Sequence, residues 1–183
     1  MKLTVREIAV LGLLLGFMEA GKRMLDLVPN VEVITLLFIL YALYLGKKAY
    51  IIAIAFTLLE TSVWGVHTWV IMYLYVWPLL ITLAIAHHRR KMRGVKTAPG
   101  GEYGIIQSEH GAFCILAAAF GLFFGAMCTI PYFFIGGPSM AFTWWIAGIP
   151  YDILHCVSNF LICLLLFRPL NYLFHRARAA GYL

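Results

Sequence analysis

The chain has 183 residues, of which 63% are hydrophobic and only 12% are charged, and its mean hydropathy is +0.89. Roughly a quarter of the residues of a soluble domain carry a charge, so this composition excludes an ordinary soluble fold. The net charge of +6 would suit a nucleic-acid-binding protein only if the basic residues shared one solvated face.

Six apolar runs are long enough, or nearly so, to cross a bilayer as helices, which takes about 20 residues each. Their unbroken apolar character favours helices over the alternating strands of a membrane barrel. We therefore predict an all-α membrane protein: a compact bundle of six transmembrane helices that forms one domain, residues 1–183. The runs are 5–25, 31–45, 49–66, 68–86, 113–135 and 149–167.

The first run carries Lys22 and Arg23 at its far end and lacks a small-residue cleavage site, so we do not interpret it as a cleaved signal peptide. Within it, Gly12, Gly16 and Ala20 recur every fourth residue and form a flat strip on which another helix can pack. From the spacing alone, packing inside the bundle and contact with a partner are equally good explanations.

Aromatic residues gather at the ends of the runs that face away from the basic loops. Trp69, Tyr73 and Trp77 share one face of the fourth run, and Tyr132 and Trp145 flank the loop before the last run. An interfacial belt explains the outermost rings, whereas rings beside a few polar groups suit an aromatic or heterocyclic ligand. The turn residues within 136–148 indicate a loop, which we interpret as a lid.

Lys and Arg predict the orientation of the bundle. Of the 14 such residues, 12 belong to the two termini and to the loops on the same side, including the polar stretch 87–111 between two three-helix halves. This bias predicts that both termini and that loop are cytoplasmic. We expect the basic residues to anchor the protein at anionic lipid heads, with no role in nucleic-acid binding.

The last run carries a polar stripe. Asp152, His155 and Asn159 are spaced by three and four residues and so share one helix face, just after Gly148 and Pro150, which indicate a helix start. Unpaired polar side chains do not point into lipid, so the stripe predicts either hydrogen bonds between helices or the lining of a solute pocket.

No motif for a metal, a nucleotide or another cofactor emerges. The four cysteines occur singly, and the adjacent His87 and His88 point about 100° apart on a helix, so a metal site is not expected. The glycine-rich match to a phosphate-binding loop at 16–23 has Arg23 where Ser or Thr would hold magnesium, and no strand precedes it.

Four short segments occur in a recognisable order: LVPNVE at 27–32, YVWP at 75–78, IPYFFIGGP at 130–138 and GIPYD at 148–152, which leads into Asn159 and Phe160. Together with six helices and cytoplasmic termini, they make the whole chain resemble the substrate-binding S components of energy-coupling factor (ECF) vitamin transporters. Such proteins are multi-pass subunits of the bacterial cell membrane and are not enzymes themselves.

The resemblance implies a partner, a transmembrane coupling subunit that carries two cytoplasmic ATPases and meets the small-residue strip of the first helix. It also implies a pocket that opens outward and is built from helices four to six and the outer loops. With the aromatic and acidic residues above, it predicts these substrate-binding residues: Glu60, Trp69, Tyr73, Trp77, Tyr132, Trp145, Asp152, His155 and Asn159.

The charge balance suggests what the ligand carries. Five of the eight acidic residues lie in or near the outer half of the predicted bundle, so we expect a cationic or hydrogen-bond-donating ligand read by Asp152 and Glu60, with its ring against Trp77 or Tyr73. Two other functions stay open: a small intramembrane enzyme with Asp152 and His155 as acid and base, and a facilitator that needs no ATPase.

Overall fold

The structure is a computed structural model that describes residues 3–95 and 101–183. Every regular element in these ranges is a helix, which confirms the predicted all-α class. In chain order the elements are α1 (Val5–Leu25), α2 (Ile34–Leu45), the 3-10 turn η1 (Gly46–Lys48), α3 (Ala49–Trp64), α4 (Thr68–Met92), α5 (Gly101–Ser108), α6 (His110–Leu122), α7 (Phe124–Cys128) and α8 (Ile130–Ala179).

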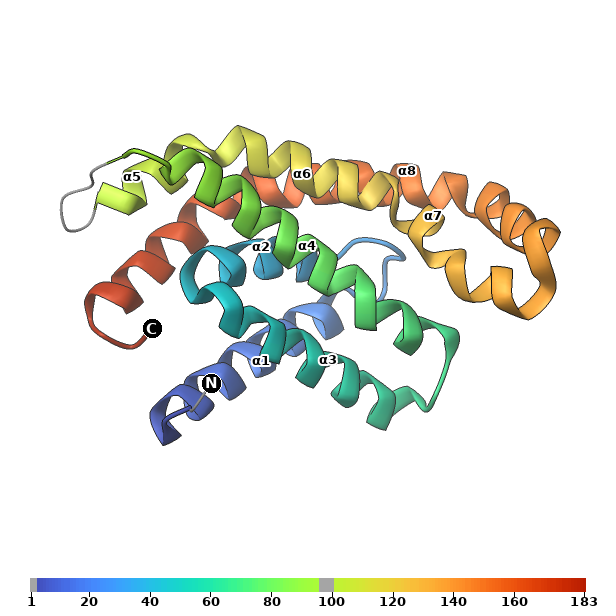
Figure 1. Cartoon of the computed structure of the whole chain (residues 1–183), viewed down its shortest axis with the longest axis horizontal. Helices are drawn as coiled ribbons and strands as arrows, with labels where there is room; N and C mark the ends of the chain where they lie inside the picture. Colours follow the sequence, from blue (N-terminus) through green and yellow to red (C-terminus); the bar gives the residue numbers. More distant parts are fainter. Residues whose placement is uncertain (1–2, 96–100) are drawn as a thin grey trace.

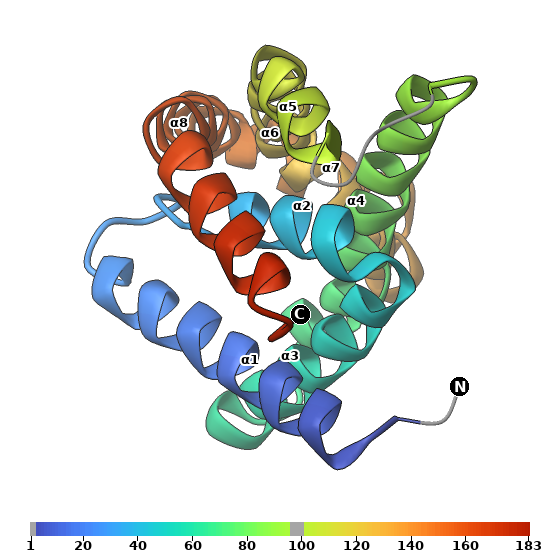
Figure 2. The ribbon, with the colours of Figure 1, turned by 90° about the vertical axis from the view of Figure 1, so that its left-hand side faces the viewer.

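Helix α2 is the centre of the bundle. All of its residues from Ile34 to Tyr44 are buried, and α1, α3, α4, α6 and α8 pack around it (Figures 1 and 2). A helix that is apolar on every side is stable only where neighbours cover it on every side. Helix α2 is therefore the shared core of the helices around it. The α1–α2 link, which precedes α2, lies among the same helices.

Within the described residues, three segments are long and apolar enough to cross a membrane: Ile34–Trp64, which combines α2, η1 and α3, then Thr68–Met92 and Ile130–Ala179. A fourth results if α5 and α6, bent by 51°, form one span. The 21-residue α1 is not among them, and it carries charged side chains near both ends. The long apolar helices are compatible with membrane insertion.

The basic segments lie at one end of the bundle. Figure 1 shows the start of α1, the C-terminus, η1 and the end of α4 toward its left-hand side, whereas the links α1–α2 and α3–α4 and helix α7 lie toward the right. The segments that the charge distribution assigns to one side of the membrane are thus neighbours in space.

Two expected boundaries are wrong. The run predicted at 113–135 is divided into α6, α7 and the start of α8, and residues 138–148, predicted as part of a loop, are helical. The only non-helical positions inside α8 are Gly136 and Gly137, where Gly137 has φ 76°, a value that glycine adopts without strain. Pro138 then restarts the helix, because proline suits a first helical turn.

The polar connection predicted at 87–111 is also shorter than expected. Helix α4 continues to Met92 and α5 begins at Gly101, and residues 96–100 lie outside the described part of the chain. Side chains near this connection join α4 to α5 and to the start of α6: His88 Nε2 lies 3.1 Å from Glu102 Oε1, and His87 Nε2 lies 2.5 Å from Glu109 Oε2. Each histidine therefore has a structural partner across the connection.

Candidate ligand-binding site

Two adjoining cavities lie at the end of the bundle opposite the basic segments. The larger has a volume of about 620 Å³ and is lined by α4, α7 and α8. The smaller, about 180 Å³, lies between the end of α1, the α1–α2 link, α4, α7 and α8, and Lys22 is among the residues that line it. Both are lined by Asn30, Tyr73 and Phe124. The shared lining makes them two compartments of one site.

The wall of this site is aromatic and tightly packed. The ring of Trp77 lies with its centroid 5.5 Å from that of Tyr73 and 5.9 Å from that of Phe124, and it stacks on Phe38 from the core helix α2 at 5.2 Å. Rings fixed in this way by their neighbours present a preformed flat surface at low entropic cost. A planar ligand therefore has a ready surface to pack against.

A histidine and a carboxylate meet where α2 begins. Glu32, in the α1–α2 link, accepts hydrogen bonds from the backbone N–H of Thr35 at 2.8 Å and from its hydroxyl at 2.5 Å, which satisfies a free donor in the first turn of α2. His155 Nε2 lies 3.2 Å from Glu32 Oε1. Because Glu32 fixes the ring through Nε2, the other nitrogen of His155 has a defined direction.

Asp152 holds the break between α6 and α7 in place. Its Oδ1 accepts a hydrogen bond from the backbone N–H of Gly125 at 2.8 Å, in the first turn of α7, where the helix itself provides no acceptor. The second oxygen, Oδ2, has no hydrogen-bond partner among the described residues. Asp152 is 5% exposed and is one of the residues that line the larger cavity, so this oxygen is a buried acceptor of a cavity-lining residue.

Four of the six buried side-chain atoms that lack a partner among the described residues belong to this region: Trp77 Nε1, Asp152 Oδ2, His155 Nδ1 and Asn159 Oδ1. A buried polar group without a partner costs roughly 1–3 kcal/mol, so native proteins contain few such atoms and a group of four in one region needs a physical reason. Trp77 and His155 line the smaller cavity and Asp152 the larger. The site thus offers donors and acceptors that the protein leaves unused.

Lys22 and Arg23 of α1 are already neutralised. Lys22 Nζ lies 2.5 Å from Glu60 Oε2 on α3, and Arg23 pairs with Glu60 at 3.2 Å, with Glu19 at 2.7 Å and with Asp26 at 3.3 Å. Glu60 is 2% exposed and belongs to neither cavity. The position of Glu60 therefore gives it the task of joining α1 to α3, in place of the ligand contact expected from the sequence.

The α1–α2 link covers the smaller cavity. Asn30 adopts a left-handed conformation with φ 58°, and its side chain donates to the backbone oxygen of Tyr151 at 3.1 Å. The hydroxyl of Ser158 donates to the backbone oxygen of Asn30 at 2.6 Å. Two contacts to α8 thus close this link over the site, a role that the sequence assigned to 136–148.

The structure brings some of the predicted residues together and leaves others apart. Trp69, Tyr73, Trp77, Asp152 and His155 line the two cavities. Asn159 lies one turn further along α8, with its Nδ2 3.2 Å from Thr35 Oγ1, next to the residue that Glu32 caps.

Tyr132 and Trp145 line neither cavity. Tyr132 is buried and stacks on Trp144 with ring centroids 4.0 Å apart, and it is Trp144 that lines the larger cavity. Trp145 is exposed beside Phe142. Adjacent positions on a helix point about 100° apart, so in the helix at 138–148 Trp144 and Trp145 face different surroundings. The loop predicted from the sequence would not have imposed this separation.

Several residues that line the site were not predicted as ligand contacts, among them Phe124, Gly125, Asn30 and Glu32. Phe124 and Gly125 enter the site only because the fifth run breaks at residue 123, and Asn30 and Glu32 enter because the α1–α2 link folds over it. Glu32 was detectable, because it is an acidic residue at the start of an apolar run within the segment 27–32.

The small-residue strip of α1 lies on the surface. Gly12, Gly16 and Ala20 are all exposed, and a Cβ added at Gly12 or Gly16 would meet nothing within 4 Å. Packing inside the bundle, one of the two explanations that the spacing left open, is therefore wrong for this strip. It remains a flat surface between exposed apolar neighbours such as Leu13 and Phe17.

Comparisons with protein-family models, with curated proteins and with solved structures find no match for this chain.

Proposed function

We propose that the chain is a membrane-embedded binding subunit that captures a vitamin or related micronutrient outside the cell for an ATP-driven importer of the energy-coupling factor type. The observation that supports it is the pair of adjoining cavities, which combine packed aromatic rings with buried polar atoms that have no partner among the described residues. The proposal includes six membrane crossings with both termini in the cytoplasm, as the distribution of Lys and Arg indicates.

The lining favours a flat ligand with a cationic group or hydrogen-bond donors at one edge. Asp152 and Glu32 supply carboxylates that pair with no Lys or Arg among the described residues. Trp77 Nε1 can only donate, so the ligand also carries an acceptor. The rings of Tyr73 and Phe124 then cover the faces of the ligand.

The same proposal assigns substrate binding to this chain and ATP hydrolysis to other proteins. ATP hydrolysis belongs to two cytoplasmic ATPases, and a transmembrane coupling subunit joins them to this chain. The exposed strip of Gly12, Gly16 and Ala20 supports such a contact, because small residues let a second helix approach closely within a membrane.

The proposal is tested by identifying small molecules that stay with the protein during purification. We expect mass spectrometry of the denatured sample to find one vitamin-like or heterocyclic compound at near-stoichiometric amount. Repeated absence of any compound, together with no thermal stabilisation by a panel of vitamins, would argue against the proposal.

Two further measurements separate the proposal from its rivals. An intramembrane enzyme that uses Asp152 and His155 as acid and base would convert the bound compound without other proteins, whereas we expect the compound to be recovered unchanged. A facilitator would take up the compound into liposomes that contain no ATPase, whereas we expect uptake only with the coupling subunit and its ATPases.

Changing Gly16 to Leu tests the partner surface. The added side chain has space in this chain and improves helix propensity by about 1 kcal/mol, so the fold and the bound compound should be unaffected. Its bulk should block close approach of a partner helix. We expect the yield of coupling subunit that co-purifies with the variant to fall by at least about tenfold, which corresponds to roughly 1.4 kcal/mol. Unchanged co-purification would exclude the strip as the interface.

A further inference from the structure

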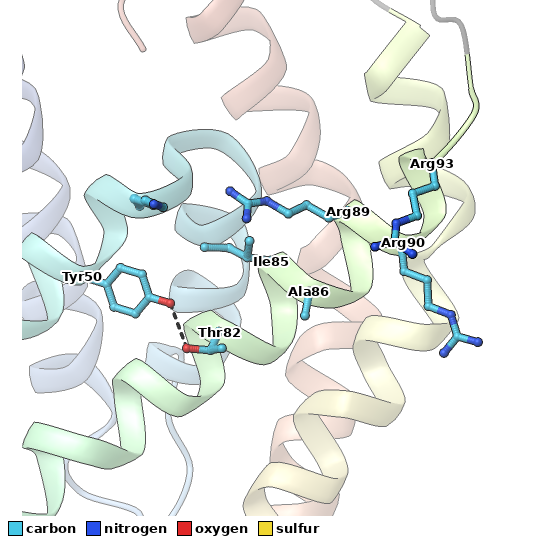
Figure 3. A pocket seen from close by; sticks show the side chains of 8 residues that line it. Tyr50, Thr82, Ile85, Ala86, Arg89, Arg90 and Arg93 are labelled. Carbon is cyan, nitrogen blue, oxygen red and sulfur yellow. Dashed lines mark hydrogen bonds between the residues drawn. The ribbon is translucent and has the colours of Figure 1, made fainter.

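A second pocket, of about 450 Å³, lies at the opposite end of the bundle, between η1, the first turn of α3 and the last turns of α4. Figure 3 shows Arg89 extending from α4 toward the start of α3, with Arg90 and Arg93 further along the chain. The lining residues are Lys47, Tyr50, Thr82, Ile85, Ala86, Arg89, Arg90 and Arg93.

The four cations of this pocket are not balanced by acidic residues. All eight acidic side chains of the chain lie in the described ranges, and no ion pair in those ranges involves Lys47, Arg89, Arg90 or Arg93. The neighbouring lysines differ, because Lys48 pairs with Glu7 and Lys91 with Glu109. Arg6, Arg168 and Arg176 also make no ion pair in those ranges, but they lie outside this pocket, which brings four unbalanced cations together.

An apolar surface continues from the pocket along α3 and α4, which pack against each other. On α3, Tyr50 is followed at intervals of four by Ile54 and Leu58, which are 53% and 65% exposed. On α4, Leu83 and Leu79 are also exposed, within a turn or two of Ala86. Within the pocket, the hydroxyl groups of Tyr50 and Thr82 are 2.8 Å apart (Figure 3). A charged end thus leads into an apolar surface between the same two helices.

We propose that this pocket binds the phosphate headgroup of an anionic phospholipid, whose acyl chains lie along the apolar surface of α3 and α4. The Arg89 guanidinium, which extends toward the start of α3, binds the phosphate oxygens through paired N–H groups (Figure 3), and Lys47 adds a point charge from the facing turn. Basic pockets between helices at the cytoplasmic side of a membrane bind such lipids. The volume is within the range of small-molecule sites. The apolar continuation distinguishes a lipid from free phosphate.

The test measures lipid retention by native mass spectrometry of the delipidated full-length protein. The probes are phosphatidylglycerol, phosphatidylcholine with the same acyl chains, and inorganic phosphate. We expect retention of phosphatidylglycerol alone. Loss of two cations in Lys47→Gln/Arg89→Gln should weaken the apparent affinity for it by about 30-fold. The control Arg168→Gln/Arg176→Gln removes the same charge at positions outside the pocket, and we expect a change of less than about threefold.

The charge-preserving exchange Lys47→Arg/Arg89→Lys checks that loss of binding reflects charge rather than misfolding, and it should restore most of the affinity. Equal losses in the two glutamine pairs would overturn the proposal in favour of diffuse attraction. Equal retention of phosphatidylcholine would exclude headgroup recognition. Displacement of phosphatidylglycerol by millimolar phosphate, with stabilisation by phosphate alone, would replace the lipid by a soluble phosphate ligand.

Discussion

Purified Asp152→Asn protein is expected to lose the compound that the parent retains. The exchange keeps an oxygen that accepts the hydrogen bond from the N–H of Gly125, so the break between α6 and α7 should survive. It removes the negative charge from a buried oxygen of this cavity-lining residue, an oxygen that has no partner among the described residues. A hydrogen bond to a charged group contributes roughly 1.5–3 kcal/mol, which predicts a loss of affinity of about 10- to 150-fold.

A matched control is Glu102→Gln, which removes one carboxylate charge at the other end of the bundle, where Glu102 pairs with Arg178 and His88. Both variants should be as stable as the parent in detergent, and binding of the identified compound should be measured by calorimetry. If Asp152→Asn binds the compound as tightly as Glu102→Gln does, the Asp152 carboxylate does not contact the ligand. The part of the proposal that depends on its charge is then wrong.

The aromatic and polar stripes of the site could be predicted from the sequence because each lies on one regular helix. Tyr73 and Trp77 are four residues apart on α4, and Asp152 and His155 are three apart on α8, so helical periodicity alone puts each pair on one face. Which faces meet depends on how the helices pack. The structure brings these two pairs to the same cavities and leaves Glu60, on α3, outside them.

The breaks in the chain were harder to predict. Residues 113–135 are apolar throughout, and hydropathy contains no information on the turns at Phe123 and Thr129. The turn at Phe123 depends on a distant residue, since Asp152 accepts the hydrogen bond of Gly125, 27 positions earlier in the chain. The opposite error arose at 136–148, where Gly136, Gly137 and Pro138 indicated a loop. Only the two glycines leave the helical conformation, and the helix resumes at once.

The partners of the charged residues near the site also could not be predicted from the sequence. Counting acidic residues in the outer half predicted a ligand-facing role for Glu60, but Lys22 and Arg23 reach it from α1. Sequence separation hides this network, because its members are 37 and 38 positions apart. The carboxylates that the network leaves without a Lys or Arg partner are Glu32 and Asp152.

Changing Gly121 to Ala is expected to destabilise the protein and to damage the site at once. A Cβ at this position of α6 would lie 2.7 Å from the backbone oxygen of His155 and 2.9 Å from the backbone nitrogen of Cys156. Backbone atoms within a long helix cannot move aside as a flexible side chain does, so α6 and α8 must separate. Overpacking of this kind costs roughly 1–3 kcal/mol, which lowers the thermal midpoint by about 2–12 °C for a chain of this size.

Gly111→Ala is the internal control for this prediction, because it lies on the same helix and an added Cβ meets nothing within 4 Å. Its thermal midpoint should be unchanged or raised, since alanine favours helix by up to about 1 kcal/mol. Gly121→Ala should also retain less of the bound compound, because its strain falls on the backbone of His155. The two variants at the site then separate two causes: Asp152→Asn loses binding with stability intact, whereas Gly121→Ala loses both. A Gly121→Ala protein as stable as Gly111→Ala would show that α6 and α8 do not approach as closely as described.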